Sequence, residues 1–367
     1  MKRILRNLDW WLIFAVLVLM GCGLGLIDSA THSFAVSTGK SWHFNRQSTF
    51  MLIAIGFAIF TLRFDYRILK NYATPFYIFN VLLLVAVMLF GHTQLGAQRW
   101  IQIGGFTVQP SEFAKVFLII CLAAFMEKRI EWLEDFKDYI PVFLYIFVPF
   151  VLVLKQPDLG TSLTFIAILL GMIFVSGFKY RWFAYCSALF VALMPLIWQF
   201  VLKDYQKNRI RVFLNPELDP YGSGYHVIQS KIAIGSGGLF GKGWLEGTQS
   251  QLNFLPENHT DFIFAVVGEE FGFVGSTILI LLYVSLVLRI ITLAERQRDA
   301  FARVYGYCVA SIFIFHIVIN LGMVLGISPV IGIPLPFFSY GGSSLWSFTI
   351  LLFILLRIDA SRTERGY

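Results

Sequence analysis

The sequence predicts an all-α, polytopic membrane protein with about ten transmembrane helices. Of its 367 residues, 57% are hydrophobic and only 14% are charged, whereas a soluble domain carries roughly 25% charged residues. Aromatic residues, which are counted among the hydrophobic ones, make up 17% of the chain. Long apolar runs recur from end to end, and about 20 such residues cross the hydrocarbon core as a helix. A soluble enzyme, a disordered protein and a coiled coil are therefore excluded.

We expect ten spans within a single transmembrane domain, 1–367. Some spans are short, which fits tilted or locally broken helices. Their approximate limits are 10–27, 47–62, 72–90, 110–126, 140–155, 159–176, 182–202, 262–288, 304–326 and 344–358. A basic stretch precedes the first span and no small-residue cleavage pattern follows it, so we expect a retained helix rather than a removed signal peptide. An even number of spans places both termini on one side.

The distribution of lysine and arginine predicts which side that is. One set of loops carries 18 of these residues, whereas the short loops on the other side, with Lys155, carry 4. Cytoplasmic loops of membrane proteins carry the excess of Lys and Arg. Both termini are therefore expected in the cytoplasm. The positive set comprises 1–9, 63–71, 127–139, 177–181, 289–303 and 357–367.

One long polar segment, 203–261, separates the seventh and eighth spans. It carries six Lys or Arg and six Asp or Glu, and long loops escape the positive-inside rule in any case. The span order places it outside the cytoplasmic membrane. Apolar residues at helical spacing within it, such as those at 226–234, predict a partly helical, ordered loop.

Several chemistries find no support in the sequence. The four cysteines lie in apolar runs and form no CxxC pair, so neither a disulfide framework nor a metal site is expected. The glycine-rich stretch 235–243 lacks the Gly and the Ser or Thr that a phosphate-binding loop needs at 236 and 243. Its glycines instead suggest close backbone packing or the approach of a ligand. The net charge of +7 follows the membrane topology and does not indicate nucleic acid.

The first of three polar clusters near the outer membrane surface lies at 109–115. Pro110 and Ser111 suit the start of a helix. Glu112 and Lys115 are three residues apart, so they share a helix face and can neutralise each other. A functional pair and a structural ion pair at a helix end explain them equally well.

The second cluster, 155–161, forms a tight outer turn between the fifth and sixth spans. Pro157 restricts this turn, and Asp158 is placed to cap the sixth helix. Capping alone would account for Asp158, and substrate contact would account for it as well.

The third cluster, 255–265, lies where the long loop re-enters the membrane. Asp261 stands at the head of an apolar helix, and Glu269 and Glu270 follow two turns later. A helix N-terminus stabilises an aspartate anion, but this many polar groups exceed what a cap needs. The stretch 334–343 is too broken for a plain helix, and such backbone is tolerated at membrane depth where it is buried or lines a cavity. We therefore predict an outward-facing cavity.

These motifs resemble those of the SEDS family (shape, elongation, division and sporulation). The resemblance extends over essentially the whole chain in the same order. The stretch 241–252 resembles the elongation members more than the division members. The matching motifs are Arg99-Trp100, Gln109-Pro110-Ser111-Glu112 with Lys115, Lys155-Gln156-Pro157-Asp158-Leu159-Gly160-Thr161-Ser162, Tyr225-His226 with Gln229-Ser230, 233–238, Leu255-Pro256-Glu257 with His259-Thr260-Asp261, and Pro336 with Ser339-Tyr340-Gly341-Gly342-Ser343.

The resemblance implies a peptidoglycan glycosyltransferase that polymerises lipid II outside the cytoplasmic membrane. Such proteins work with a class B penicillin-binding protein, which crosslinks the product; by resemblance we expect it to contact spans 262–288 and 304–326. Other elongation proteins such as MreC and MreD are further expected partners. In the family the carboxylate that matches Asp261 is essential, and the pair that matches Glu112 and Lys115 lines the same cavity.

The reaction that the resemblance implies needs a base for the acceptor hydroxyl and positive charge for the leaving pyrophosphate. One carboxylate, Asp261, suffices as the base because pyrophosphate leaves without a general acid. Candidates to hold the pyrophosphate are Arg99, Lys115, Lys155, Arg209 and Arg211. The remaining expected substrate contacts are Glu112, Trp100, Asp158, Gln229, Ser230, His259, Thr260, Ser339 and Ser343. No cofactor is certain; a divalent cation, Mg or Mn, could share the charge, although the sequence shows no ligand set.

Two other functions fit part of the sequence. A lipid II flippase would also have ten spans and buried charges, but a transporter is expected to bind near the midplane, whereas these motifs cluster on the outer side. A scaffold that only docks a transpeptidase would need neither Asp261 nor a charged cavity. The sequence therefore favours the enzyme.

Overall fold

The computed structural model is mostly helical and describes residues 5–39, 41–94, 97–129, 135–219, 222–252 and 254–362. The helices that match the predicted spans are α2 (Trp10–Ala30), α4 (Trp42–Arg63), α6 (Ala73–Phe90), α7 (Pro110–Glu127), α8 (Ile140–Lys155), α9 (Leu159–Val175), α10 (Tyr180–Leu196), α14 (Ile263–Glu295), α15 (Ala300–Val324) and α16 (Gly342–Ala360). A π-helical turn, Ile197–Val201, extends α10. Short helices are α3 (His32–Thr38) and α5 (Tyr66–Asn71).

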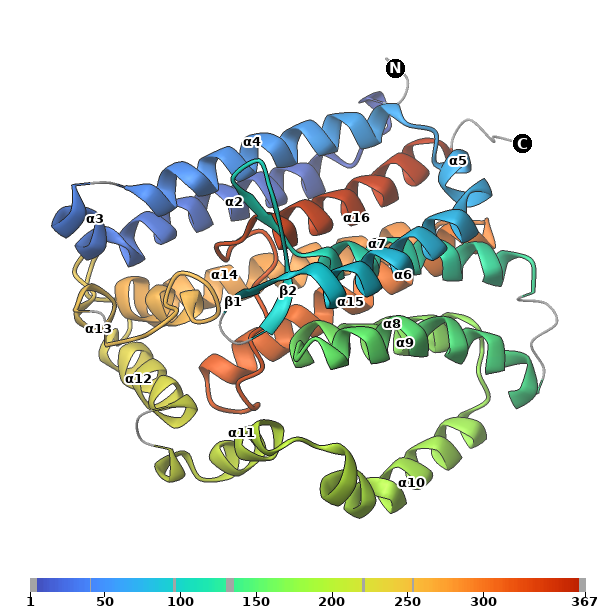
Figure 1. Cartoon of the computed structure of the whole chain (residues 1–367). Coiled ribbons are helices and arrows are strands. Elements are labelled where there is room, and N and C mark those ends of the chain that lie inside the picture. The colour runs from blue at the N-terminus through green and yellow to red at the C-terminus, as the bar shows by residue number, and fades with distance from the viewer. Residues whose placement is uncertain are drawn as a thin grey trace.

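The long helices run roughly parallel to one another and form one bundle (Figure 1). The start of α2 and the end of α16 lie at the same end of the bundle (Figure 1). The short elements α3, α12 (Ser223–Ser236) and α13 (Thr248–Gln251) gather at the opposite end. Helices α12 and α13 of the long polar segment therefore lie at the end of the bundle opposite the start of α2 and the end of α16.

Within the described part of the chain, seven helices are long and apolar enough to cross a membrane. They are α2, α6, α8 with the 3-10 turn Phe136–Tyr139 before it, α10 with its π-helical turn, α14, α15 and α16. Helix α9 is apolar but shorter, and α7 carries three charged residues, Glu112, Lys115 and Glu127. The seven long apolar helices make the chain a multi-pass membrane protein.

The prediction of an all-α fold is wrong for residues 92–108. Strands β1 (His92–Gln94), β2 (Ala97–Ile103) and β3 (Phe106–Val108) form an antiparallel sheet in the order β1-β2-β3. Gly104 and Gly105, with φ of 54° and 86°, make the turn that pairs Ile103 with Phe106. Both glycines adopt the left-handed backbone that this reversal requires. Arg99 and Trp100 lie on β2, the middle strand of this sheet, and β3 leads into α7.

The long polar segment is ordered wherever the structure describes it, as its apolar spacing predicted. It holds α11 (Asp204–Leu214), a 3-10 turn at Pro216–Leu218, α12 and α13. Residues 325–341, which precede α16, form turns and irregular backbone rather than a helix. The predicted irregular stretch, 334–343, is therefore confirmed up to residue 341, and its last two residues begin α16.

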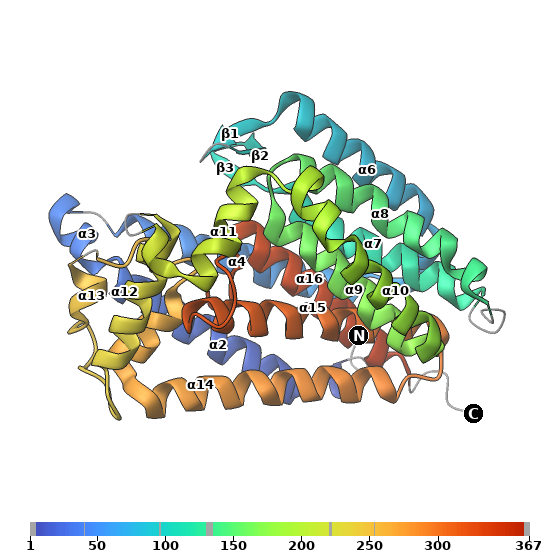
Figure 2. The ribbon, with the colours of Figure 1, turned by 90° about the horizontal axis from the view of Figure 1, so that it is seen from below.

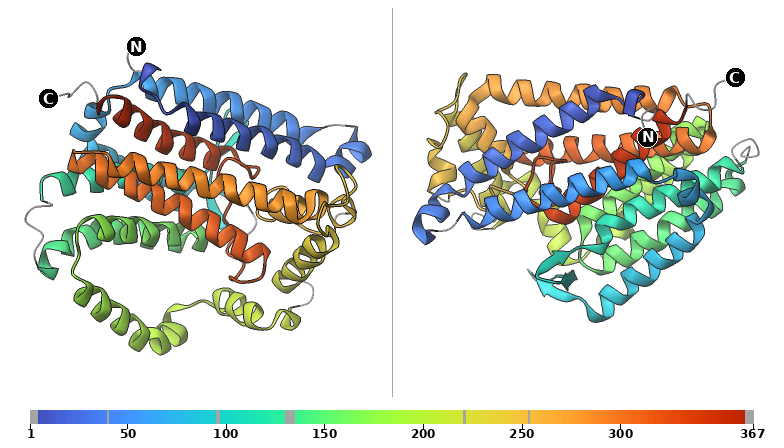
Figure 3. Two further views of the ribbon diagram at one scale, coloured as in Figure 1. Left: turned by 180° about the vertical axis from the view of Figure 1, so that it is seen from behind. Right: turned by 90° about the horizontal axis from the view of Figure 1, so that it is seen from above.

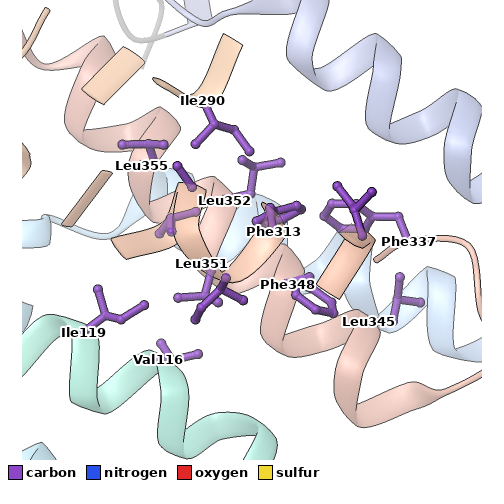
Figure 4. Close-up of a cluster of buried hydrophobic side chains, with 14 of the residues drawn as sticks. Val116, Ile119, Ile290, Phe313, Phe337, Leu345, Phe348, Leu351, Leu352 and Leu355 are labelled. Carbon is purple, nitrogen blue, oxygen red and sulfur yellow. The ribbon is translucent and has the colours of Figure 1, made fainter. Parts of the chain in front are cut away.

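The core lies between α7, α14, α15 and α16. Figure 4 shows Val116 and Ile119 of α7 facing Phe313 of α15 and the leucines of α16. Helix α16 is apolar on nearly every side, and 83% of its span is buried. By contrast no residue of α10 is buried, and Figures 2 and 3 show α10 at the margin of the bundle. The central helix and the marginal helix therefore differ in packing, although both are apolar.

Candidate functional site

Asp158 organises the turn between α8 and α9. Its carboxylate accepts hydrogen bonds from the Thr161 amide at 3.1 Å and the Thr161 hydroxyl at 2.8 Å, so the predicted helix cap is present. Gln109 Nε2 donates to the same carboxylate at 2.7 Å, and Arg99 Nη1 lies 3.5 Å away. Asp158 therefore caps α9 and also links Arg99 and Gln109 to the N-terminal end of that helix.

Arg99 extends from β2, so the sheet that the sequence did not predict decides its position. Its guanidinium carbon lies 5.9 Å from the centre of the Trp100 ring. Among the described residues, Arg99 Nε is shielded from solvent and has no hydrogen-bond partner. An arginine held at one nitrogen by Asp158 keeps other donors for a ligand anion.

Asp261 lies immediately before α14 without capping it. The N-cap is Phe262, and no side-chain hydrogen bond caps this helix. The Asp261 carbonyl accepts from Asn320 Nδ2 at 3.0 Å, and a Cβ built on Gly332 would lie 3.3 Å from Asp261 Oδ2. The carboxylate thus stands between the start of α14, the end of α15 and the irregular segment 325–341.

The charges around Asp261 set its affinity for a proton. Burial raises its pKa to about 6, and the carboxylates of Glu257 and Asp158 act in the same direction. Arg99 and Arg209 oppose this effect and lower the pKa. A carboxylate with this pKa is mostly ionised at neutral pH yet basic enough to accept a proton.

Arg209 approaches Asp261 from α11 in the long polar segment. Its Nη1 donates to the Ile331 carbonyl at 3.2 Å, which fixes α11 against the segment 325–341. Burial lowers the pKa of Arg209, whereas Tyr205 and Asp261 raise it. Arg99 and Arg209, predicted from distant parts of the sequence, therefore both act electrostatically on the Asp261 carboxylate. Arg211, two residues further along α11, is exposed and lies over Trp198 instead.

Glu112 and Lys115 form the predicted ion pair one turn inside α7. The distance from Lys115 Nζ to Glu112 Oε2 is 2.8 Å, and neither side chain is open to solvent. Ser347 donates to the same glutamate oxygen at 3.3 Å, and the Lys115 ammonium lies 5.0 Å from the centre of the Phe348 ring. Through Ser347 and Phe348 the pair thus connects α7 to α16.

Ser343 and Ser339 support the backbone around this group. The Ser343 hydroxyl accepts a hydrogen bond from the Gln109 amide at 3.0 Å, which fixes the start of α7 to the start of α16. The Ser339 hydroxyl accepts from the Leu335 amide at 2.8 Å and closes a turn. Both serines are buried, and their contacts hold backbone segments together.

His259 and Thr260 lie next to Asp261 but their contacts lead elsewhere. The His259 ring lies 4.8 Å from the His43 ring and 5.4 Å from the Tyr340 ring, between centroids. Burial, with His43, lowers the pKa of His259 to about 4, so this imidazole is neutral at physiological pH. Thr260 donates to Glu257 Oε2 at 2.9 Å.

Three residues predicted to contact the substrate, Lys155, Gln229 and Ser230, make no interaction with Asp261 among those that the structure describes. Lys155 is exposed at the end of α8. Ser230 donates to the Val324 carbonyl at the end of α15, and Gln229 is half-buried beside it on α12. These residues are thus spread over α8 and α12.

Asn320 is a residue of this site that the sequence reasoning did not select. Its amide nitrogen donates to the carbonyls of Asp261 and Ile333, the latter at 2.7 Å. It therefore joins the two segments that meet at the carboxylate. The available signal was a polar residue in an apolar run, since Asn320 lies within the predicted span 304–326.

Within the described ranges, no group of three or more His, Cys, Asp or Glu side chains is placed to hold a metal ion. A role for a divalent cation stays a prediction.

Comparison with known proteins identifies relatives along the whole chain. A family model described as "Cell cycle protein", which groups the FtsW, RodA and SpoVE proteins, matches residues 10–364. The peptidoglycan glycosyltransferase MrdB of Escherichia coli K12 is 46% identical over 295 residues, which cover 80% of each chain.

Two solved structures share the fold. The rod shape determining protein RodA of Thermus thermophilus is 30% identical, with a TM-score of 0.73 and 97% of each chain covered. A chain from a peptidoglycan synthase complex that coordinates polymerisation and crosslinking is 33% identical, with a TM-score of 0.82, covering 97% of this chain and 98% of that one. The chain therefore belongs to the SEDS family of FtsW, RodA and SpoVE proteins and is RodA-like within it.

Proposed function

We propose that this protein is a peptidoglycan glycosyltransferase that polymerises lipid II on the outer face of the cytoplasmic membrane during cell elongation. Its family and the activity named for its E. coli relative support this function. The observation that carries the chemistry is the Asp261 carboxylate, whose pKa is raised to about 6 between Arg99 and Arg209. A base and two anion-binding groups thus stand together.

In the proposed reaction Asp261 accepts the proton of the acceptor sugar hydroxyl. The hydroxyl oxygen forms a bond to the anomeric carbon of the donor sugar, and the bond from that carbon to the pyrophosphate oxygen breaks. Attack opposite the leaving group inverts the configuration, so an α-linked donor yields a β-linked glycan. Arg99 and Arg209 hold the departing pyrophosphate, whose negative charge increases as the bond breaks.

The proposed topology has ten spans, cytoplasmic termini and an outward-facing site. The ten helices that match the predicted spans support it. Ion pairs lie at the end opposite Asp261: Lys70 with Glu127, Arg289 with Asp9, and Arg296 with Asp359. Their position agrees with the excess of Lys and Arg expected of cytoplasmic loops.

A class B penicillin-binding protein is the proposed partner, docking on α14 and α15. Apolar side chains on these helices are exposed, among them Ile278 and Leu281 of α14 and Val318 of α15. The similarity to a chain of a synthase complex that joins polymerisation to crosslinking supports such an assembly. MreC, MreD and a divalent cation remain predictions.

The decisive experiment measures lipid II polymerisation by the purified protein with a transpeptidase-inactive partner, comparing wild type with Asp261→Asn. We expect glycan from wild type and a rate about 10²–10⁴-fold lower from the variant, which still folds and binds the partner. Equal rates would remove Asp261 from the mechanism. If neither protein makes glycan, the transferase is overturned, and lipid II transport in proteoliposomes tests the flippase.

A further inference from the structure

Helix α14 is kinked at Gly272, where φ is 64° and ψ is −157°. The glycine-rich loop 237–243 crosses this kink. Lys242 N donates to the Glu269 carbonyl at 3.0 Å, and Gly243 N donates to the Glu270 carbonyl at 3.1 Å. In return Phe273 N donates to the Gly238 carbonyl at 2.9 Å. The kink therefore leaves backbone groups that the loop satisfies.

Glycine is required on both sides of this contact. A Cβ on Gly241, whose φ is 83°, would lie 2.1 Å from the Glu270 carbonyl oxygen. A Cβ on Gly272 would lie 2.3 Å from the Gly241 nitrogen. The loop and the kink are thus fitted to each other at backbone distance, which accounts for glycines that do not form a phosphate-binding loop.

The Glu269 carboxylate fixes the next part of the loop to the kinked helix. Within the described residues it accepts hydrogen bonds from five groups. These are Lys242 Nζ (2.8 Å), Thr248 Oγ1 (3.3 Å), the Gln249 amide (2.8 Å), the Ser250 amide (3.1 Å) and the Ser250 hydroxyl (3.2 Å). The carboxylate is buried, so its charge is compensated by Lys242 and by the amides at the start of α13.

Hydrogen bonds continue from α13 to the segment that carries Asp261. Asn258 Nδ2 donates to the Ser250 carbonyl at 3.3 Å and to the Ala30 carbonyl of α2 at 3.0 Å. Asp261 follows Asn258 by three residues, and the first part of α14, Ile263–Phe271, begins two residues later. Both ends of the Asp261 segment are therefore attached, one through Asn258 and the other through Glu269.

We propose that Glu269 is a positioning residue for Asp261. Its carboxylate holds α13 against the first part of α14 and so sets the direction in which Asp261 faces Arg99 and Arg209. Glu269 itself stands two turns along the helix from Asp261 and takes no proton in the reaction. The inference rests on the proposed function, since it assigns a role relative to the base of that reaction.

The test is Glu269→Gln, measured by lipid II polymerisation in the full complex with the partner. Glutamine has the same shape but one acceptor oxygen, so the donors of Lys242 and α13 lose partners. We expect kcat to fall about 10-fold to 100-fold with KM changed less than threefold, as 1 Å displacements of reacting groups do. The acidic limb of the kcat/KM profile should move to higher pH. Displacing Asp261 from Arg99 and Arg209 removes their lowering effect on its pKa.

Asp9→Asn is the matched control for stability. Asp9, the N-cap of α2, pairs with Arg289 near the C-terminal end of α14, whereas Asp261 lies before the N-terminal end of that helix. This variant should lower the melting temperature while kcat and the pH profile stay as in wild type. Equal losses of kcat in Asp9→Asn and Glu269→Gln at equal melting temperatures would reduce Glu269 to a structural role.

Lys242→Met keeps the test decisive if Glu269→Gln fails to fold. It removes one of the five donors and leaves both α13 amides in place, so kcat should fall severalfold and the acidic limb should move the same way. Unchanged kcat and an unchanged pH profile in the folded variants overturn the inference. Failure of the proposed function is distinct, because wild type would then make no glycan.

Discussion

Lys115 Nζ lies 2.8 Å from Glu112 Oε2 inside the helix bundle, and both side chains are buried. Such a pair is balanced only while both partners are present. Desolvating one charge costs several kcal/mol, and the partner offsets this cost through its own charge and hydrogen bonds. The same contact therefore permits a test of whether the pair is structural or takes part in the reaction.

Glu112→Gln or Lys115→Ala alone should destabilise the protein by about 3–5 kcal/mol, because each leaves an unpaired buried charge. Each should also impair polymerisation. The double variant Glu112→Gln/Lys115→Met removes both charges and should recover most of the melting temperature. If polymerisation also returns to the wild-type rate in the double variant, the pair is structural alone.

Asp261→Asn should lower the polymerisation rate by about 10²–10⁴-fold, the usual contribution of a general base. The same change should stabilise the fold at pH 7.5 by about 1–3 kcal/mol. The folded pKa of about 6 lies above the ordinary 3.8, so ionising Asp261 costs more free energy in the folded protein than in the unfolded one. This loss of stability is fully present above pH 6. Thermal unfolding at pH 7.5 and pH 4 checks this, since the gain should disappear at the lower pH.

Arg209→Ala should raise the KM for lipid II about 10-fold or more, because a charge-assisted contact to the pyrophosphate is lost. Arg211→Ala is the control, since Arg211 is exposed on the same helix and lies over Trp198. Steady-state kinetics on both variants distinguish a specific contact from general positive charge. Equal effects of the two changes would contradict the assignment of Arg209.

The acidic limb of the kcat/KM profile should shift in opposite directions in Glu257→Gln and Arg209→Ala. In wild type, kcat/KM should fall as the pH drops through about 6, because protonated Asp261 cannot act as a base. Glu257 raises this pKa and Arg209 lowers it. Glu257→Gln should therefore shift the acidic limb to lower pH, and Arg209→Ala should shift it to higher pH. Coincident limbs in all three proteins would show that another group titrates.

Contact with the partner should be sensitive to bulk on α14 and α15. Leu281→Trp and Val318→Trp enlarge exposed apolar side chains and should weaken co-purification of the penicillin-binding protein, with little change in melting temperature. Phe190→Trp on the exposed surface of α10 is the control. Undiminished co-purification in the first two variants would place the partner on another face.

Local sequence features predicted two contacts of the candidate site, because the physics of those contacts acts over a few residues. Asp158 caps α9 through Thr161, three residues along, and Glu112 meets Lys115 on one helix face. Both contacts follow from helical spacing. Arg99 is different, because the loop 91–109 showed no helical pattern and Arg99 lies on β2, which pairs with both β1 and β3.

The sequence by itself determined that the chain crosses a membrane, where its helices lie and which polar residues stand at their ends. Hydrophobic length and charge placement are properties of each segment alone. Only the tertiary structure decided that Arg99, Arg209 and Asp261 surround one point and that Glu269 holds α13. These residues are separated by up to 170 positions, and their meeting depends on how α7, α11, α14 and α15 pack, which no local periodicity specifies.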